Sequence, residues 1–227
     1  MNRLILVRYG EIILKGLNRG AFEDKLIKNI KMVLNGLGKI KIIKSQGRIY
    51  VEFFDEQYPL TKAIERLIKV PGIVSVSEAV KLDNDMNQIQ HTAKKLLKQI
   101  ISNGGVTTFK VQTKRGNKLF YLSSQELSKE LGGYILESIP DLKVDVHNPD
   151  VILYVEVREQ TYVYASIIPG IGGMPMGTNG KAMLLLSGGI DSPVAGWMIA
   201  KRGVELEAVH FYSYPYTSER AKDKVIE

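Results

Sequence analysis

The sequence predicts two α+β units followed by the beginning of an α/β unit. Three observations support this fold class. Apolar residues recur at helical spacing in separate segments, short apolar or alternating runs lie between them, and a strand, glycine loop, helix, strand pattern follows a glycine-rich stretch. With 227 residues, 44% hydrophobic and 24% charged, the composition is that of a globular chain and excludes a disordered, collagen-like or coiled-coil protein.

The first unit, residues 1–58, is predicted to run strand, helix, strand, strand. The expected elements are 3–9, 19–35, 39–44 and 48–54. The helix is assigned from one apolar face, made by Phe22, Leu26, Ile30 and Val33. Gly36 should end it, and Ser45-Gln46-Gly47 has the composition of a turn between the two strands.

The second unit, residues 59–168, is predicted to alternate helices with strands. The expected helices are 61–69, 85–102 and one that begins at Ser123 or Ser124 and ends near Ser138. The expected strands are 73–82, 107–115, 143–146, 151–158 and 161–168. Along 107–115 the residues alternate, so that Lys110 and Lys114 share one face of the strand.

The charge of the chain is positive and unevenly placed. Thirty-one basic and 24 acidic residues give +7, and residues 1–60 hold 11 basic and 6 acidic residues, a difference of +5. No Asp or Glu occurs between Asp85 and Glu126, a stretch that contains seven lysines and arginines. A polyanionic partner and a solvated lysine-rich face explain this pattern equally well.

Several functional classes are excluded or disfavoured by composition. No apolar run approaches the roughly 20 residues that cross a bilayer, and Leu4–Val7 is too short for a secretion signal, so we expect a cytoplasmic protein with no membrane partner. The absence of cysteine excludes disulfides, thiolate metal sites and a cysteine nucleophile within this chain. Its three histidines have no metal-binding spacing.

Residues 169–180 are predicted to be a linker, with a long ordered loop as the alternative. The third unit, 181–227, then begins with an apolar strand at 182–186, expected to be buried on both faces of a parallel sheet. Pro193 suits the first position of a helix capped by Ser192 or Asp191. Gly203 should end this helix before a second strand at 204–212.

The loop between the first strand and the helix has the chemistry of a phosphate site. In Ser187-Gly188-Gly189-Ile190-Asp191-Ser192 the glycines let the backbone turn its N–H groups inward, and the two serines add hydroxyl groups. The positive end of the helix dipole favours an anion there. The loop lacks the lysine of the Walker motif, and it matches neither the dinucleotide fingerprint nor a nucleophile elbow.

This loop resembles that of the PP-loop, or ATP pyrophosphatase, families at every fixed position. The resemblance implies cleavage of ATP between its α and β phosphates, with Ser187, Gly188, Gly189 and Ser192 holding the phosphates. It gives Asp191 a catalytic role, as a ligand of Mg²⁺ or a positioner of ATP. His210 and Phe211, at the end of the second strand, together with the backbone of Leu185 and Leu186, are expected to contact adenine or ribose.

Two further regions extend the resemblance over nearly the whole chain. Arg8-Tyr9-Gly10-Glu11 through Lys15-Gly16 and Asn18-Arg19 resembles the ferredoxin-like domain of the tRNA 4-thiouridine synthase (tRNA sulfurtransferase) family. The segment Phe109–Arg115, with Ser124, Glu126 and Gly132-Gly133, resembles its RNA-binding THUMP domain. His210-Phe211 through Pro215, Thr217, Ser218 and Glu219 resembles its PP-loop domain.

The resemblance implies a tRNA-modifying enzyme. In this family the THUMP domain holds the acceptor end of tRNA, and O4 of uridine 8 is adenylated and replaced by sulfur. The sulfur comes from a persulfide that a cysteine desulfurase supplies, and the same sulfur flow feeds thiazole synthesis for thiamine. The cofactors implied are ATP and Mg²⁺.

The basic strand supplies the expected tRNA-binding residues. Lys110, Lys114, Arg115 and Lys118 are predicted to contact phosphates, and Phe120 to stack on an unpaired base. The alternative is a sheet edge protected by lysines.

The chain departs from the family by its length. Family members carry a cysteine and further ATP-site residues beyond the point that corresponds to Glu227, so we expect a truncated sequence whose activity alone is in doubt. A non-catalytic tRNA-binding fragment and an amidating PP-loop synthetase are the alternative functions. The oligomeric state stays open, with a homodimer as one option.

Overall fold

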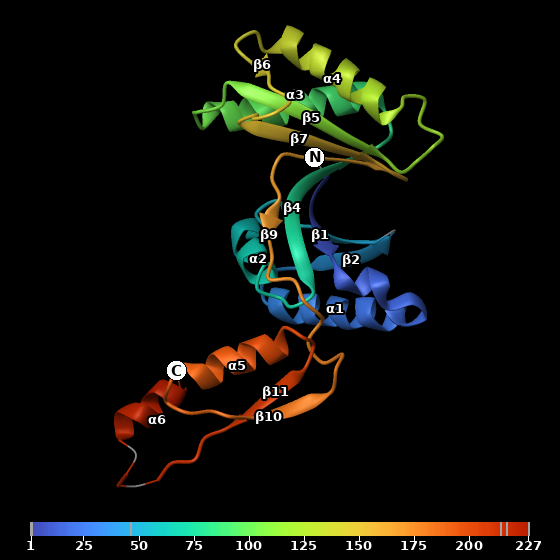
Figure 1. The fold of residues 1–227 in the computed structure, drawn as a ribbon. Helices are drawn as coiled ribbons and strands as arrows, with labels where there is room; N and C mark the ends of the chain where they lie inside the picture. The colour runs from blue at the N-terminus through green and yellow to red at the C-terminus, as the bar shows by residue number, and fades with distance from the viewer. Residues whose placement is uncertain (1, 46, 214, 217, 227) are drawn as a thin grey trace. The chain divides into compact units, whose positions relative to one another are not determined.

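A computed structural model describes residues 2–45, 47–213, 215–216 and 218–226 (Figure 1). The chain divides into two compact units, each made of segments that are distant in sequence. Unit 1 consists of Met1–Leu6, Tyr50–Phe53 and Ser77–Ile168, and unit 2 of Val7–Ile49, Phe54–Val76 and Pro169–Glu227.

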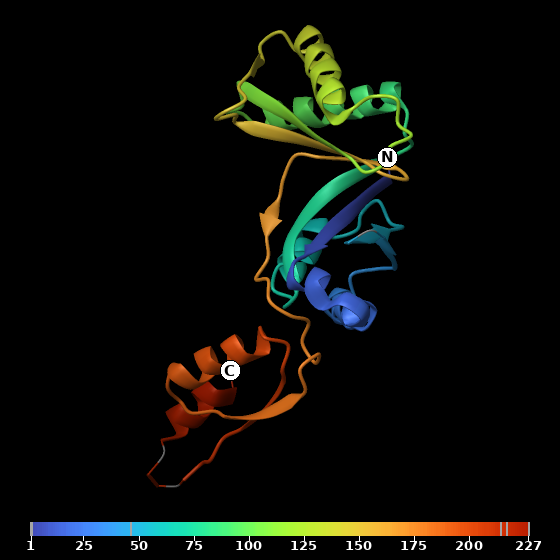
Figure 2. The same ribbon diagram turned by 45° about the vertical axis from the view of Figure 1, so that its right-hand side comes forward.

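Unit 1 contains most of one large sheet and two helices that cover one of its faces (Figure 2). Its elements in chain order are α3 (Met86–Ser102), β5 (Thr108–Arg115), α4 (Ser124–Ser138), β6 (Lys143–Val144), β7 (Val151–Val157) and β8 (Thr161–Tyr164). Strand β5 pairs in parallel with β7 and β6, and β8 is antiparallel to β7 and to β4 (Ile73–Leu82).

The core of unit 1 forms where the apolar stripes of α3 and α4 meet one face of β5 and β7. Phe109, Leu153 and Val155 are fully buried there, and so are Ile89, Leu97, Leu127 and Leu131 of the helices. Helix α4 begins at a capping box, because Ser123 Oγ accepts from the N–H of Glu126 while the Glu126 carboxylate accepts from the N–H of Ser123. Of the two predicted caps, Ser123 is the one used.

Unit 2 contains η1 (Glu11–Asn18), α1 (Arg19–Leu34), β2 (Ile40–Ser45) and α2 (Leu60–Leu67). Strands β1 (Asn2–Tyr9), β3 (Arg48–Phe53) and β4 each contribute residues to both units. The large sheet has the order β2-β3-β1-β4-β8-β7-β5-β6, and β9 (Ile168–Pro169) pairs with β4.

The last part of unit 2 is a separate small sheet with helices. Its elements are β10 (Lys181–Leu185), α5 (Asp191–Ala200), β11 (Glu205–Val209) and α6 (Glu219–Ile226). Strands β10 and β11 are parallel, with Lys181 opposite Glu205 and Leu185 opposite Val209. The predicted strand, loop, helix, strand order is confirmed.

Most predicted elements occur within a residue or two of their expected bounds, but some expectations are wrong. Strand β10 is largely exposed rather than buried, because in the described chain it pairs with β11 alone and α5, the helix that packs on both strands, can cover only one face of the sheet. Strands β6 and β11 are shorter than expected, and 161–168 divides into β8 and β9. The turn residue Gln46 lies outside the described residues.

The predicted cap of α5 is also wrong. The helix begins at Asp191, so that Asp191 and Ser192 lie in its first turn and Pro193 is its third residue. Ile190 occupies the cap position, and its side chain makes no capping hydrogen bond. The hydroxyl of Ser192 instead accepts a hydrogen bond from the N–H of Ser187 in the preceding loop.

Candidate functional site

The loop between β10 and α5 is closed by its two serines. The N–H of Ser187 donates to Oγ of Ser192 at 2.9 Å, and the two hydroxyl oxygens lie 3.0 Å apart. The N–H of Gly189 donates to Oγ of Ser187 at 3.3 Å. Because these bonds join the first and last residues of the loop, Ser187 to Ser192 form a compact turn rather than an open one.

This turn lies at the amino end of α5, where backbone N–H groups are available. The first N–H groups of a helix have no partner within the helix, and here no side chain of the cap residue Ile190 satisfies them. The helix dipole adds partial positive charge at the same point. Gly188 and Gly189 add no side chains, so the backbone can approach an anion closely. The arrangement is able to bind phosphate groups.

Asp191 brings a negative charge to the same place. It is the first residue of α5 and is exposed. A carboxylate beside bound phosphates would repel them unless a cation lay between the two. Among the described residues no cluster of three or more His, Cys, Asp or Glu could hold a metal by itself. Any metal at Asp191 would therefore take most of its remaining ligands from phosphates and water, as Mg²⁺ commonly does.

His210 follows β11 and contacts the end of β10. Its Nδ1 lies 2.8 Å from the carbonyl oxygen of Leu186, whose N–H donates to the carbonyl of Val209 at 2.9 Å. Because a carbonyl oxygen can only accept, Nδ1 carries a proton in this hydrogen bond. Nε2 is buried and has no hydrogen-bond partner among the described residues.

The other residues expected at the nucleotide base are accessible. The ring of Phe211 is 74% exposed and the side chain of Leu185 is exposed. Contacts of His210, Phe211, Leu185 and Leu186 with adenine or ribose stay a prediction. Thr217, part of the same resemblance, lies outside the described residues.

The expected RNA-binding residues of unit 1 fall into two groups. Lys114 and Lys118 are exposed, and their side chains make no ion pair or hydrogen bond within the described residues. Lys110 is half-buried and donates to the carbonyl of Val146 at 3.0 Å. Arg115 is exposed, but its Nη1 donates at 3.3 Å to the carbonyls of Phe120 and Leu122, so this guanidinium also holds the following loop.

The prediction for Phe120 is wrong. Its ring is only 6% exposed and belongs to the core between the helices and the sheet, so it has no free face for a nucleic-acid base. Its neighbours Leu119 and Tyr121 point outward instead, at 93% and 69% exposure. The sequence did not indicate that Tyr121 is the exposed aromatic residue of this loop. Three consecutive apolar or aromatic residues in a loop have no periodicity that distinguishes a buried side chain from an exposed one.

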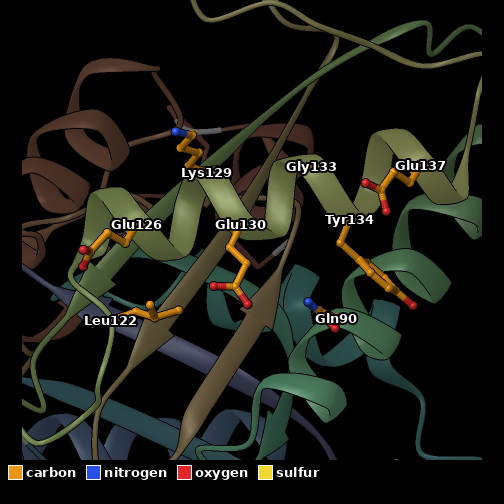
Figure 3. Close-up of a pocket in the computed structure, with 8 residues that line it drawn as sticks. All are labelled: Gln90, Leu122, Glu126, Lys129, Glu130, Gly133, Tyr134 and Glu137. Atoms are coloured by element: carbon orange, nitrogen blue, oxygen red, sulfur yellow. The ribbon is translucent and has the colours of Figure 1, made fainter.

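Unit 1 also has a groove between α3 and α4, which no sequence pattern indicated (Figure 3). Its lining includes Glu126, Glu130, Tyr134 and Glu137 of α4 and Gln90 of α3. With three carboxylates against the single cation of Lys129, this lining repels phosphate groups. The groove is therefore not part of a basic surface formed by Lys114 and Lys118.

In the described residues, no helix is both long enough and apolar enough to cross a membrane.

Three family models match the chain in sequence order. The ThiI ferredoxin-like domain matches residues 4–77, the THUMP domain matches residues 83–165, and the thiamine biosynthesis protein (ThiI) model matches residues 177–227. A probable tRNA sulfurtransferase of Acetivibrio thermocellus is 64% identical over 227 residues, which are 100% of this chain and 58% of the relative. The chain thus spans little more than half the length of such relatives.

Solved structures agree with the sequence comparison. A crystal structure of a 4-thiouridine synthetase in complex with RNA and bound ATP superposes with a TM-score of 0.87 at 41% identity, covering 100% of this chain and 57% of that one. PH1313 from Pyrococcus horikoshii superposes with a TM-score of 0.86 at 32% identity, covering 99% and 73%. With all three of its domain models matched in order, the chain belongs to the ThiI, or tRNA sulfurtransferase, family.

Proposed function

We propose that this chain is the RNA-binding and ATP-loop part of an ATP-dependent tRNA sulfurtransferase that converts uridine 8 of tRNA to 4-thiouridine. The observation that carries the proposal is the serine-closed turn at the amino end of α5, in a chain that also has a THUMP domain with exposed lysines. The likeness to a 4-thiouridine synthetase with RNA and ATP supports the pairing of these two features.

The phosphates of ATP would bind in the turn from Ser187 to Ser192. Backbone N–H groups at the start of α5 would donate to the phosphate oxygens, and the serine hydroxyls would add further donors. The adenosine would lie along the ends of β10 and β11, beside Leu185, Leu186, His210 and Phe211. Asp191 would act as the catalytic carboxylate, since it is exposed next to these donors.

A magnesium ion fits this site on chemical grounds, because it would separate the Asp191 carboxylate from the phosphates. When bound, Mg²⁺ would neutralise charge on the phosphates and make pyrophosphate a better leaving group. Asp191 would hold the ion, and the turn amides would fix the oxygens of the phosphate chain.

The RNA would supply the nucleophile. O4 of uridine 8 would attack the α-phosphorus, the bond to the β-phosphate would break, and pyrophosphate would leave. The terminal sulfur of a persulfide would then attack C4, the C4–O4 bond would break, and AMP would depart with the former O4. A second thiol, from outside this chain, would attack the inner sulfur of the resulting S–S bond, which would release 4-thiouridine and leave a disulfide for a thiol reductant to reduce. A cysteine desulfurase would supply the persulfide, and since this chain has no cysteine, the residue that carries the sulfur lies outside it. The protein would work in the cytoplasm, and its sulfur would also feed thiamine thiazole synthesis.

The catalytic part of the proposal is tested with Asp191→Ala in the protein at the full length of its relatives. We expect tRNA affinity to stay within about twofold, since Asp191 is not on the basic surface, and tRNA-dependent pyrophosphate release to fall at least about a hundredfold. Glu207→Ala, which also removes an exposed carboxylate from unit 2, is the matched control and should retain activity. Full turnover by Asp191→Ala would defeat the catalytic assignment.

The RNA-binding part is tested with Lys114→Ala combined with Lys118→Ala. These lysines are the cleanest choice because Lys110 and Arg115 also bind other parts of the protein. Loss of two phosphate contacts should weaken tRNA binding and reduce its log–log salt slope by about 1.4–1.8. The control pair Lys129→Ala and Lys143→Ala removes the same charge from exposed positions of the same unit. An equal change of the salt slope in both pairs of variants would contradict the assignment of phosphate contacts to Lys114 and Lys118, because net charge alone would then explain the effect.

A further inference from the structure

The glycine-rich segment 169–180, orange in Figure 1, is hydrogen-bonded on both of its sides within unit 2. Backbone hydrogen bonds of 2.8–3.0 Å join its first half to the segment 68–74. The N–H groups of Gly170, Ile171 and Gly172 donate to the carbonyls of Val74, Ile68 and Ile73, and the N–H of Gly72 donates to the carbonyl of Gly172. This pattern is that of a strap fixed to the turn between α2 and β4, and we call residues 169–180 the strap.

The second half of the strap is bonded to the carboxyl end of α5. The N–H of Met174 donates to the carbonyl of Lys201 at 2.9 Å, and the N–H groups of Gly177 and Asn179 both donate to the carbonyl of Gly203. The Asn179 side chain donates to the carbonyl of Arg202 at 2.5 Å. Met174 itself is buried. The end of α5 is thus held by backbone and side-chain bonds together.

Direct side-chain contacts reinforce this connection. Arg202 makes a two-pronged ion pair with Glu11 of η1, with N–O distances of 3.1 and 3.2 Å. Asn29 of α1, which is 5% exposed, donates to the carbonyl of Met176 in the strap at 3.2 Å. Both sides of the Arg202–Glu11 pair are partly exposed, so the pair adds little to stability. Its two parallel bonds nevertheless fix an orientation.

The strap also packs closely against the residues that follow α5. Gly173 has a φ of 81°, and a Cβ there would overlap the carbonyl of Lys201. Gly172, its neighbour, has a φ of 67°, but a Cβ there would meet nothing within 4 Å. The two glycines therefore share the same backbone requirement and differ only in how closely α5 approaches them.

We propose that the strap and the Glu11–Arg202 pair form a rigid joint that sets the position of the Ser187–Ser192 turn, and that Arg202 is a positioning residue for the reaction. The turn lies at the amino end of α5 and the joint at its carboxyl end. The ten residues of α5 make a rod of about 15 Å, so a tilt of about 10° at the joint would move the turn by about 2.6 Å. A misplacement of about 1 Å can cost about a hundredfold in rate.

The joint itself is tested by hydrogen exchange in the full-length protein without substrate. The amides of Met174, Gly177 and Asn179 should be strongly protected, because each donates to a backbone carbonyl. Exchange as fast as that of an exposed loop would show a flexible linker and overturn the proposal, whatever the enzyme's activity.

The positioning role rests on the proposed function and is tested by charge exchange. Glu11→Arg and Arg202→Glu should each lower kcat for tRNA-dependent pyrophosphate release by about tenfold, with the Kd for tRNA unchanged within about twofold. In the double variant, kcat should recover to within about threefold of the wild-type value. Variants that had lost their fold would not recover in this way. Arg3→Glu, which breaks an exposed pair with Glu78 in unit 1, is the matched control and should leave kcat unchanged.

A steric pair of variants checks the same joint independently of charge. Gly173→Ala should lower kcat and the protection of the strap amides, whereas Gly172→Ala should do so far less. Equal effects of the two alanines, wild-type kcat in Arg202→Glu, or no recovery in the double variant would each refute the positioning role. An inactive wild type would instead refute the proposed function and leave the exchange result as the test of the joint.

Discussion

Replacing Ser192 by alanine tests whether the two serines hold the proposed nucleotide-binding turn in its closed form. Ser192 accepts from the N–H of Ser187 and shares a hydrogen bond with the Ser187 hydroxyl, at 2.9 and 3.0 Å. A net hydrogen bond contributes about 0.5–1.5 kcal/mol, and at this partly exposed site we take the lower half of that range. Two bonds then stabilise the closed turn by about 1–2 kcal/mol, which corresponds to about a 5- to 30-fold rise in the Kd for ATP.

The assay is calorimetric titration of the full-length protein with ATP and Mg²⁺, beside a thermal melt that verifies folding. Ser102→Ala, which removes one local bond from a serine hydroxyl to the carbonyl of Gln99 at the end of α3, is the control and should leave the Kd unchanged. The double variant Ser187→Ala, Ser192→Ala should bind about as weakly as the weaker single variant, because the two serines share a bond. A Kd within twofold of the wild type for Ser192→Ala, or strictly additive losses in the double variant, would refute the closed-turn reasoning.

Three further predictions concern stability. Hydrogen bonds from Thr107 and Thr108 lower the pKa of Asp150 to about 2, below its unfolded value of about 3.9, so its stabilising effect is fully present above about pH 4 and is lost as pH falls through 2. Thermal melts from pH 2 to 6 should show that Asp150→Asn has a lower Tm than the wild type at pH 6 and that its Tm depends less on pH. Phe109→Ala should destabilise unit 1 by about 3–5 kcal/mol in urea unfolding, since the ring is fully buried. Tyr9→Phe should cost about 1–3 kcal/mol in the same experiment, because the buried Glu23 carboxylate loses the hydroxyl that donates to it at 2.5 Å, and a change below about 0.5 kcal/mol would contradict that reasoning.

The order of elements and the place of the Ser187–Ser192 turn could be predicted because both depend on short stretches of sequence. The stripe of apolar residues that marks α3 and the alternation along β5 each need only a few neighbouring residues to be recognised. The turn from Ser187 to Ser192 is likewise local, since its shape depends on two glycines and two hydroxyl groups within six residues. Its position between a strand and a helix can therefore be predicted from the sequence alone.

What the sequence left undecided depends on contacts between residues far apart in the chain. Phe120 and Tyr121 are adjacent aromatic residues, and only the packing of α3 and α4 against the sheet buries the first and exposes the second. Gly173 is part of a predicted linker, yet the carbonyl of Lys201 leaves no room for a side chain there. Glu11 and Arg202 are 191 residues apart and meet because the folded backbone of unit 2 brings η1 beside the end of α5. Sequence patterns report each residue's preference along its own helix or strand, whereas these pairings arise from close packing in three dimensions, which no local pattern encodes.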